Sequence, residues 1–127
     1  FEEYRPLFAA RNLSVVFLVT AHTEERRVRL IDELSSGFIY AVSADATTGQ
    51  RLEVDQSRRI FFERLAAMRL RNPVMVGFGV HNRASFDAAS EHARGAIVGS
   101  AFIRALEGKG ALEEKVRSFM EQFAGRK

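Results

Sequence analysis

Four short runs of apolar residues divide this chain, and a longer stretch with helical spacing follows each of them. The runs are continuous and rich in β-branched side chains, which is typical of strands buried on both faces of a parallel sheet. They cover residues 14–19, 37–43, 73–79 and 95–99. Because strands and helices alternate along the chain, the pattern predicts an α/β fold with parallel strands and right-handed crossovers.

The stretches outside these runs predict six helices, since their apolar residues recur at helical spacing. Thr23 is placed to cap the second helix. A polar stretch over 43–55 is too long for a simple turn and is expected to form a loop after the second strand. The expected helices cover residues 3–11, 23–34, 55–70, 82–93 and 100–108, with a final helix whose apolar stripe runs from Leu112 to Phe123.

Composition places the chain among folded globular proteins. Its 127 residues suffice for one domain over residues 1–127, and 46% hydrophobic with 28% charged residues is a globular balance. No apolar run approaches the roughly 20 residues of a membrane helix, so no membrane association is expected. The absence of cysteine excludes disulfides and fits a cytoplasmic location. The chain opens within a helical pattern and without Met, so we expect a fragment.

The charge pattern does not favour nucleic-acid binding. Lys and Arg number 19 against 16 Asp and Glu, a net charge of +3. The paired arginines at 26–27 and 58–59 have acidic neighbours, and no basic stripe is interleaved with exposed aromatic residues. A solvated helix surface is therefore the better interpretation of these charges.

Glycines mark the loops that follow the last three predicted strands. They occur at Gly49, at Gly77 and Gly79, and at Gly99, which is followed directly by Ser100 at the start of a short helix. Glycine lets backbone N–H groups approach an anion closely, and a helix start offers free N–H groups. One such glycine alone is more often a simple turn residue. Three glycine-marked loops at successive strand ends predict a phosphate site.

Other candidate chemistry is sparse. The histidines at positions 22, 81 and 92 lack metal-ligand spacing and are interpreted as loop or helix-surface residues. Tyr40, within the second strand, is compatible equally with the core and with a ligand contact at the mouth of the sheet. Asp45 is interpreted as a solvated loop residue, and no pair of carboxylates is placed for acid/base catalysis.

Three motifs together resemble the carboxy-terminal half of the tryptophan synthase alpha subunit family. They are SSGFIYAVSADATTG, PVMVGFGV and GAIVGSAFIRALE, and their order and spacing cover essentially the whole chain. The family fold is a TIM (β/α)₈ barrel of about 250 residues. The resemblance implies that this chain supplies units five to eight of the barrel, with a short extra helix after the last strand.

The resemblance also implies a lyase of tryptophan biosynthesis that cleaves indole-3-glycerol phosphate, a small phosphorylated substrate, into indole and glyceraldehyde-3-phosphate. It implies no cofactor in this chain, because pyridoxal phosphate belongs to the beta subunit, the partner in an α₂β₂ complex. The family's acid/base carboxylates lie in the first half of the barrel. The chain alone is therefore expected to be inactive and to need the missing amino-terminal half-barrel.

Two alternatives remain open: another phosphate-binding barrel of aromatic amino-acid biosynthesis, similar to indole-glycerol-phosphate synthase, and a non-catalytic half-barrel that serves assembly. The sequence TTGQ and the strand tyrosine favour the lyase over the synthase.

Carried over residue by residue, the family's site assigns seven positions. The implied phosphate-binding residues are Gly49, Gly79, Gly99 and Ser100, and the implied substrate contacts are Tyr40, Thr48 and Phe78. Thr48 matches the threonine of the family's mobile loop, and Phe78 matches its indole-side phenylalanine. The chain departs from the family at Ala44, where many members have arginine, and at Ala46-Thr47, where glycine-valine is usual. Both departures concern closure of that loop.

Overall fold

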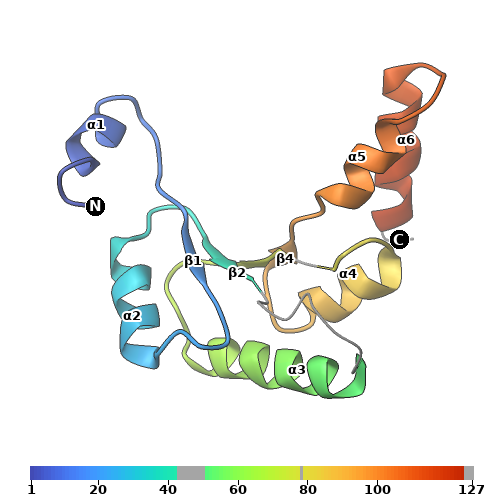
Figure 1. Ribbon diagram of the computed structural model, residues 1–127. Coiled ribbons are helices and arrows are strands. Elements are labelled where there is room, and N and C mark those ends of the chain that lie inside the picture. Colours follow the sequence, from blue (N-terminus) through green and yellow to red (C-terminus); the bar gives the residue numbers. More distant parts are fainter. Residues whose placement is uncertain (43–50, 78, 125–127) are drawn as a thin grey trace.

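The computed structural model describes residues 1–42, 51–77 and 79–124, and it contains one four-stranded parallel sheet (Figure 1). The strands lie side by side in chain order, so that each one pairs with the next. Their bounds are Phe17–Val19 for β1, Ile39–Ala41 for β2, Val74–Val76 for β3 and Gly95–Ala96 for β4. The predicted parallel strand–helix order is confirmed, although each strand is shorter than its apolar run.

Six helices accompany the sheet in the part of the chain that the structure describes, and their bounds differ from the predicted ones by up to four residues. They are α1 (Arg5–Ala9), α2 (Glu25–Leu34), α3 (Arg51–Ala67), α4 (Arg83–Ser90), α5 (Ser100–Leu106) and α6 (Leu112–Phe123). Helix α3 begins four residues earlier than expected, because no glycine or proline after residue 50 stops a helix from starting there. Thr23 does not cap α2: its hydroxyl accepts a hydrogen bond from the Thr20 N–H at 2.9 Å, and Glu24 is the N-cap residue.

The core lies on one face of the sheet, between the strands and helices α2, α3 and α4. Val19, Ile39 and Val76 are fully buried there and pack with Phe61 and Leu65 of α3. Successive strand residues point to opposite faces, so the residues between them face away from these helices. This chain's own helices therefore cover one face of the strands, and the second apolar face that the sequence predicts is left uncovered.

A row of aligned residues crosses the uncovered face of the sheet. Leu18 pairs with Tyr40, and Tyr40 pairs with Met75. Leu18, at one edge, is 58% exposed, whereas Tyr40 and Met75 are half-buried. The uncovered face of the sheet is therefore partly apolar.

Near the amino ends of the strands, a group of hydrogen bonds surrounds Asp32, which lies near the end of α2. Its carboxylate accepts hydrogen bonds from the backbone N–H groups of Arg71 and Asn72, each at 2.8 Å. The Arg71 guanidinium donates in return to the Asp32 and Glu33 carbonyls, at 3.1 and 3.0 Å. Burial raises the pKa of Asp32, but the hydrogen bonds from Arg71 and Asn72 outweigh it and leave that pKa below its ordinary value. These hydrogen bonds join the end of α2 to the segment that enters β3.

Helices α5 and α6 form a hairpin with a small aromatic core of its own, and Figure 1 shows them next to each other, beyond α4. Phe119 of α6 packs against Phe102 of α5 and against Phe123, with ring centroids 5.2 and 5.0 Å apart. Phe86 of α4 contacts Phe123 edge-on at 5.7 Å. These rings attach the helix that follows the last strand to the rest of the fold.

Candidate functional site

A hollow of about 360 Å³ lies at the carboxyl ends of β2, β3 and β4. It gathers the four predicted site residues that the structure describes, Tyr40, Gly79, Gly99 and Ser100, from three separate parts of the chain. The other lining residues are Gly77, Val80, His81, Ile97, Ala101 and Arg104. Function in parallel α/β folds collects at this end of the strands, so the hollow is the candidate site.

The remaining predicted site residues, Thr48, Gly49 and Phe78, lie outside the described residues. The same is true of Asp45 and of the family departures over 44–47. The geometry of the hollow therefore rests on the ends of the strands and on the first turn of α5.

Tyr40 reaches the hollow from the middle of β2. Its hydroxyl donates a hydrogen bond to the Gly77 carbonyl at 3.2 Å. A Cβ on Gly77 would overlap the Tyr40 ring, so the ring lies where only glycine leaves room. Tyr40 is half-buried and lines the hollow, and its contact with a ligand stays a prediction.

Gly79 turns the chain after β3. Its φ of +60° lies in the left-handed region, which favours glycine. The turn sends Val80 back into the core and leaves His81 exposed at the rim of the hollow. The His81 Nδ1 lies 2.7 Å from the Gly79 carbonyl, and because a carbonyl only accepts, this nitrogen carries the proton. Sequence reasoning treated His81 as a surface residue; its closeness to Gly79 in the chain was the available signal.

Gly99 and Ser100 form the floor of the hollow at the start of α5. Gly99 is the N-cap residue, and its carbonyl accepts the first intrahelical bond, from the Ile103 N–H at 3.1 Å. The backbone N–H groups of the preceding first turn have no partner within the helix. A Cβ on Gly99 would meet no described atom within 4 Å, so the space in front of this turn is open. The arrangement suits an anion that accepts several backbone hydrogen bonds.

The charge of the hollow also suits an anion. Among the described residues that line it, His81 and Arg104 are basic and none is acidic. The absence of a carboxylate from this lining leaves the described part of the site without an acid/base pair. Arg104 was not singled out from the sequence, because an arginine on a short helix is usually a solvated residue.

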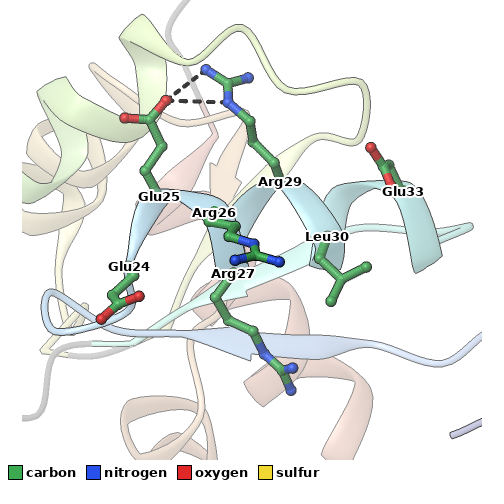
Figure 2. A pocket seen from close by; sticks show the side chains of 7 residues that line it. All are labelled: Glu24, Glu25, Arg26, Arg27, Arg29, Leu30 and Glu33. Atoms are coloured by element: carbon green, nitrogen blue, oxygen red, sulfur yellow. Dashed lines mark hydrogen bonds and ion pairs between the residues drawn. The ribbon is translucent and has the colours of Figure 1, made fainter.

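A larger hollow, on the outer face of α2, has a different character. Figure 2 shows acidic side chains and arginines together along that one helix and its N-cap residue, with Glu25 and Arg29 paired at 2.7 Å. The lining residues are Glu24, Glu25, Arg26, Arg27, Arg29, Leu30 and Glu33. Such a mixed, solvent-facing surface confirms the interpretation of these charges as a solvated helix face.

Within residues 1–42, 51–77 and 79–124, no three His, Cys, Asp or Glu side chains gather closely enough to hold a metal ion. No helix in that part of the chain is both long and apolar enough to cross a membrane.

Comparison with known sequences gives a consistent family. The sequence profile of the tryptophan synthase alpha chain family matches residues 2–126. The tryptophan synthase alpha chain of Phocaeicola vulgatus is 44% identical over 114 residues, which are 90% of this chain and 44% of that relative. The relative from Bacteroides thetaiotaomicron is 47% identical over 106 residues, 84% of this chain and 41% of its own. The chain thus spans less than half the length of these relatives.

Comparison with solved structures gives the fold. A tryptophan synthase α₂β₂ complex from Pyrococcus furiosus contains a chain that is 31% identical, with a TM-score of 0.72 over 96% of this chain and 50% of that one. The tryptophan synthase alpha subunit from Campylobacter jejuni, at 22% identity, superposes with a TM-score of 0.76 over 98% of this chain and 50% of its own. The predicted partial (β/α)₈ barrel is confirmed.

Proposed function

The chain belongs to the tryptophan synthase alpha chain family, and we propose that it supplies the phosphate-binding part of a barrel that cleaves indole-3-glycerol phosphate into indole and glyceraldehyde-3-phosphate. The observation that carries this proposal is the hollow, where Tyr40, Gly79, Gly99 and Ser100 converge around an open space that no acidic side chain among the described residues lines. A phosphate fits this site better than a neutral or cationic ligand does.

In this proposal the phosphate accepts hydrogen bonds from the backbone around Gly79 and from the first turn of α5. Each hydrogen bond to a charged group contributes about 1.5–3 kcal/mol. The positive end of the short α5 dipole adds about 0.3–1 kcal/mol at most. The Ser100 hydroxyl supplies one more donor, and Gly49 completes the phosphate site by family resemblance.

The rest of the substrate extends from the phosphate toward the uncovered face of the sheet, where Tyr40 lies. Its ring is held over Gly77 by the hydroxyl bond to the Gly77 carbonyl, so the phenol oxygen keeps lone pairs for a substrate hydroxyl. Family resemblance assigns Phe78 to the indole side and Thr48 to the loop that closes over the site.

We propose that the acid/base groups come from the part of the barrel that this chain does not span. One positioned acid or base contributes roughly 10²–10⁴-fold in rate. Holding the phosphate equally well in the substrate and in the transition state does not accelerate cleavage. The chain alone should therefore bind phosphate and release no indole.

The proposed partner is a tryptophan synthase beta subunit. The Pyrococcus furiosus relative is part of an α₂β₂ complex, and we propose the same type of assembly for the whole protein, with pyridoxal phosphate on the beta subunit and none on this chain. A cytoplasmic location belongs to the same proposal.

The test uses a chimera in which the part of the Phocaeicola vulgatus relative that this chain does not match is joined to this chain. The chimera should release indole from indole-3-glycerol phosphate, and the lone chain should not. Gly99→Val, which fills the open space in front of α5 and keeps the phosphate off the backbone donors, and Ser100→Glu, which repels the phosphate, should weaken glycerol 3-phosphate binding by at least tenfold in calorimetry.

Circular dichroism should show the fold of both variants retained, since the space around Gly99 is open. Gly37→Ala is the matched control, because its Cβ would make only an ordinary contact with Ser14, at 3.7 Å. Unchanged affinity in Gly99→Val and Ser100→Glu would contradict the phosphate assignment.

A further inference from the structure

Some arginines on the helices of this chain are held in ion pairs, whereas others, among them Arg27 and Arg104, form none among the residues that the structure describes. Three arginines on α2, α3 and α4 form ion pairs one turn away, with N–O distances of 2.7–2.8 Å. These pairs are Arg29 with Glu25, Arg59 with Glu63, and Arg83 with Asp87. Among the described residues Arg104 forms no ion pair, and Glu107, three positions later, lies beyond the helix in an extended conformation. Its guanidinium is therefore available to a ligand.

The position of Arg104 on α5 directs it to the hollow. It follows Ser100 by four residues, so the two side chains lie one turn apart on the same face of the helix. Helical side chains lean toward the amino end of their helix, which here is the end that borders the hollow. Arg104 lines that hollow together with Ser100 and Ala101.

A guanidinium supplies what the rest of the hollow does not. Backbone N–H groups and the Ser100 hydroxyl are neutral donors that each reach one oxygen. A phosphate monoester carries close to two negative charges at neutral pH. The planar fork of an arginine donates two parallel hydrogen bonds to two phosphate oxygens and brings a full positive charge.

We propose that Arg104 binds the phosphate group of the ligand directly and makes the hollow selective for a dianionic phosphomonoester over a singly charged phosphodiester. This inference rests on the proposed function of the hollow, and it adds a side-chain cation to a site otherwise built from backbone and hydroxyl donors. Arg104 stands beside the phosphate end of the substrate and takes no part in proton transfer.

The experiment uses the chimera with Arg104→Gln and Arg104→Lys, titrated with glycerol 3-phosphate and with its phosphate methyl ester, which carries one charge. Arg104→Gln should bind glycerol 3-phosphate about tenfold more weakly and lose most of the preference for the dianion. Arg104→Lys keeps the positive charge but lacks the paired donors of a guanidinium, so its affinity for glycerol 3-phosphate should fall between those of the wild type and Arg104→Gln. In indole release, Arg104→Gln should raise KM and leave kcat nearly unchanged, because the contact is made equally in substrate and transition state.

Arg27→Gln is the matched control, since Arg27 is exposed on α2 and its loss removes the same charge away from the hollow. It should change the affinity by less than twofold. Equal weakening in Arg27→Gln and Arg104→Gln would reduce the effect to net charge and overturn the inference. Unchanged affinity in Arg104→Gln, with binding lost in Gly99→Val, would overturn the inference and leave the phosphate site standing. A chimera that binds no glycerol 3-phosphate at all would overturn both.

Discussion

The close approach of the Tyr40 ring to Gly77 gives a sharp prediction for Gly77→Ala. A Cβ at position 77 would overlap three atoms of the tyrosine side chain, Cε2, Cζ and the hydroxyl oxygen. The ring has to swing away, and the 3.2 Å hydrogen bond to the Gly77 carbonyl is lost with it. The substitution should therefore cost stability and also displace Tyr40 from the hollow.

The magnitude combines three contributions. Overpacking costs about 1–3 kcal/mol, a lost neutral hydrogen bond costs about 0.5–1.5 kcal/mol, and the stiffer unfolded chain returns about 0.4–1 kcal/mol. The free energy of unfolding should fall by about 0.5–4 kcal/mol in Gly77→Ala. Because Tyr40→Phe removes only the hydroxyl, it should cost no more than about 1.5 kcal/mol.

The assay is a double-mutant cycle in the chimera, in which urea denaturation measures the unfolding free energy of each variant. In a Tyr40→Ala background the space beside residue 77 is already empty, so Gly77→Ala should lower the unfolding free energy by less than about 1 kcal/mol there. The difference from the cost in the wild type is the coupling energy of the two sites, which for residues in contact is about 0.5–3 kcal/mol. Gly37→Ala again serves as a neutral control. Additive effects of Gly77→Ala and Tyr40→Ala would refute the reasoning, because they would show that the two side chains do not compete for the same space.

Two further predictions concern stability away from the hollow. Burial raises the pKa of Asp32, but the hydrogen bonds from Arg71 and Asn72 lower it by more, so the folded-state pKa lies below the ordinary value. The stabilisation by this carboxylate is therefore complete above the unfolded-state pKa and is lost as the pH falls below about 4. Unfolding free energies measured from pH 7 to 3 should drop more steeply for the wild type than for Asp32→Asn, and parallel curves would contradict this. Asn82 and Ser85 form a capping box at the start of α4, so Asn82→Ala should lower the unfolding free energy by about 0.5–2 kcal/mol in a thermal melt, and an unchanged midpoint would count against the cap.

Much of the fold could be predicted from the sequence because its strongest signal is periodic. The apolar runs around Val19, Ile39 and Val76 mark three of the four strands, and their alternation with helical stretches already implies parallel pairing. The start of α3 at Arg51 could not be predicted in the same way, since a polar stretch without a helix breaker is compatible with both a loop and a helix. The same runs carry apolar residues for a second face, that of Leu18, which this chain's own helices do not cover.

The candidate site could be predicted only where the backbone itself leaves a trace in the sequence. Gly79 stands out because its left-handed turn favours glycine, and Gly99 because an apolar run ends there directly before a helix. His81 and Arg104 carry no such mark. Their place in the hollow depends on which way a turn and a helix face point once the strands are assembled, and a single sequence does not encode that as a motif.

The aromatic core of the α5–α6 hairpin bears on how ligand binding affects this end of the molecule. Phe102, Phe119 and Phe123 hold the two helices to each other, and Phe86 links them to α4. Phe86 and Phe123 also pack against the core that contains Val19, Ile39 and Val76, and the Arg83 guanidinium donates a hydrogen bond to the Phe123 carbonyl at 3.0 Å. A bound anion that bridges α5 and the turn at Gly79 would add a second tie between the hairpin and the sheet, so ligand binding should stabilise the packing of the last two helices.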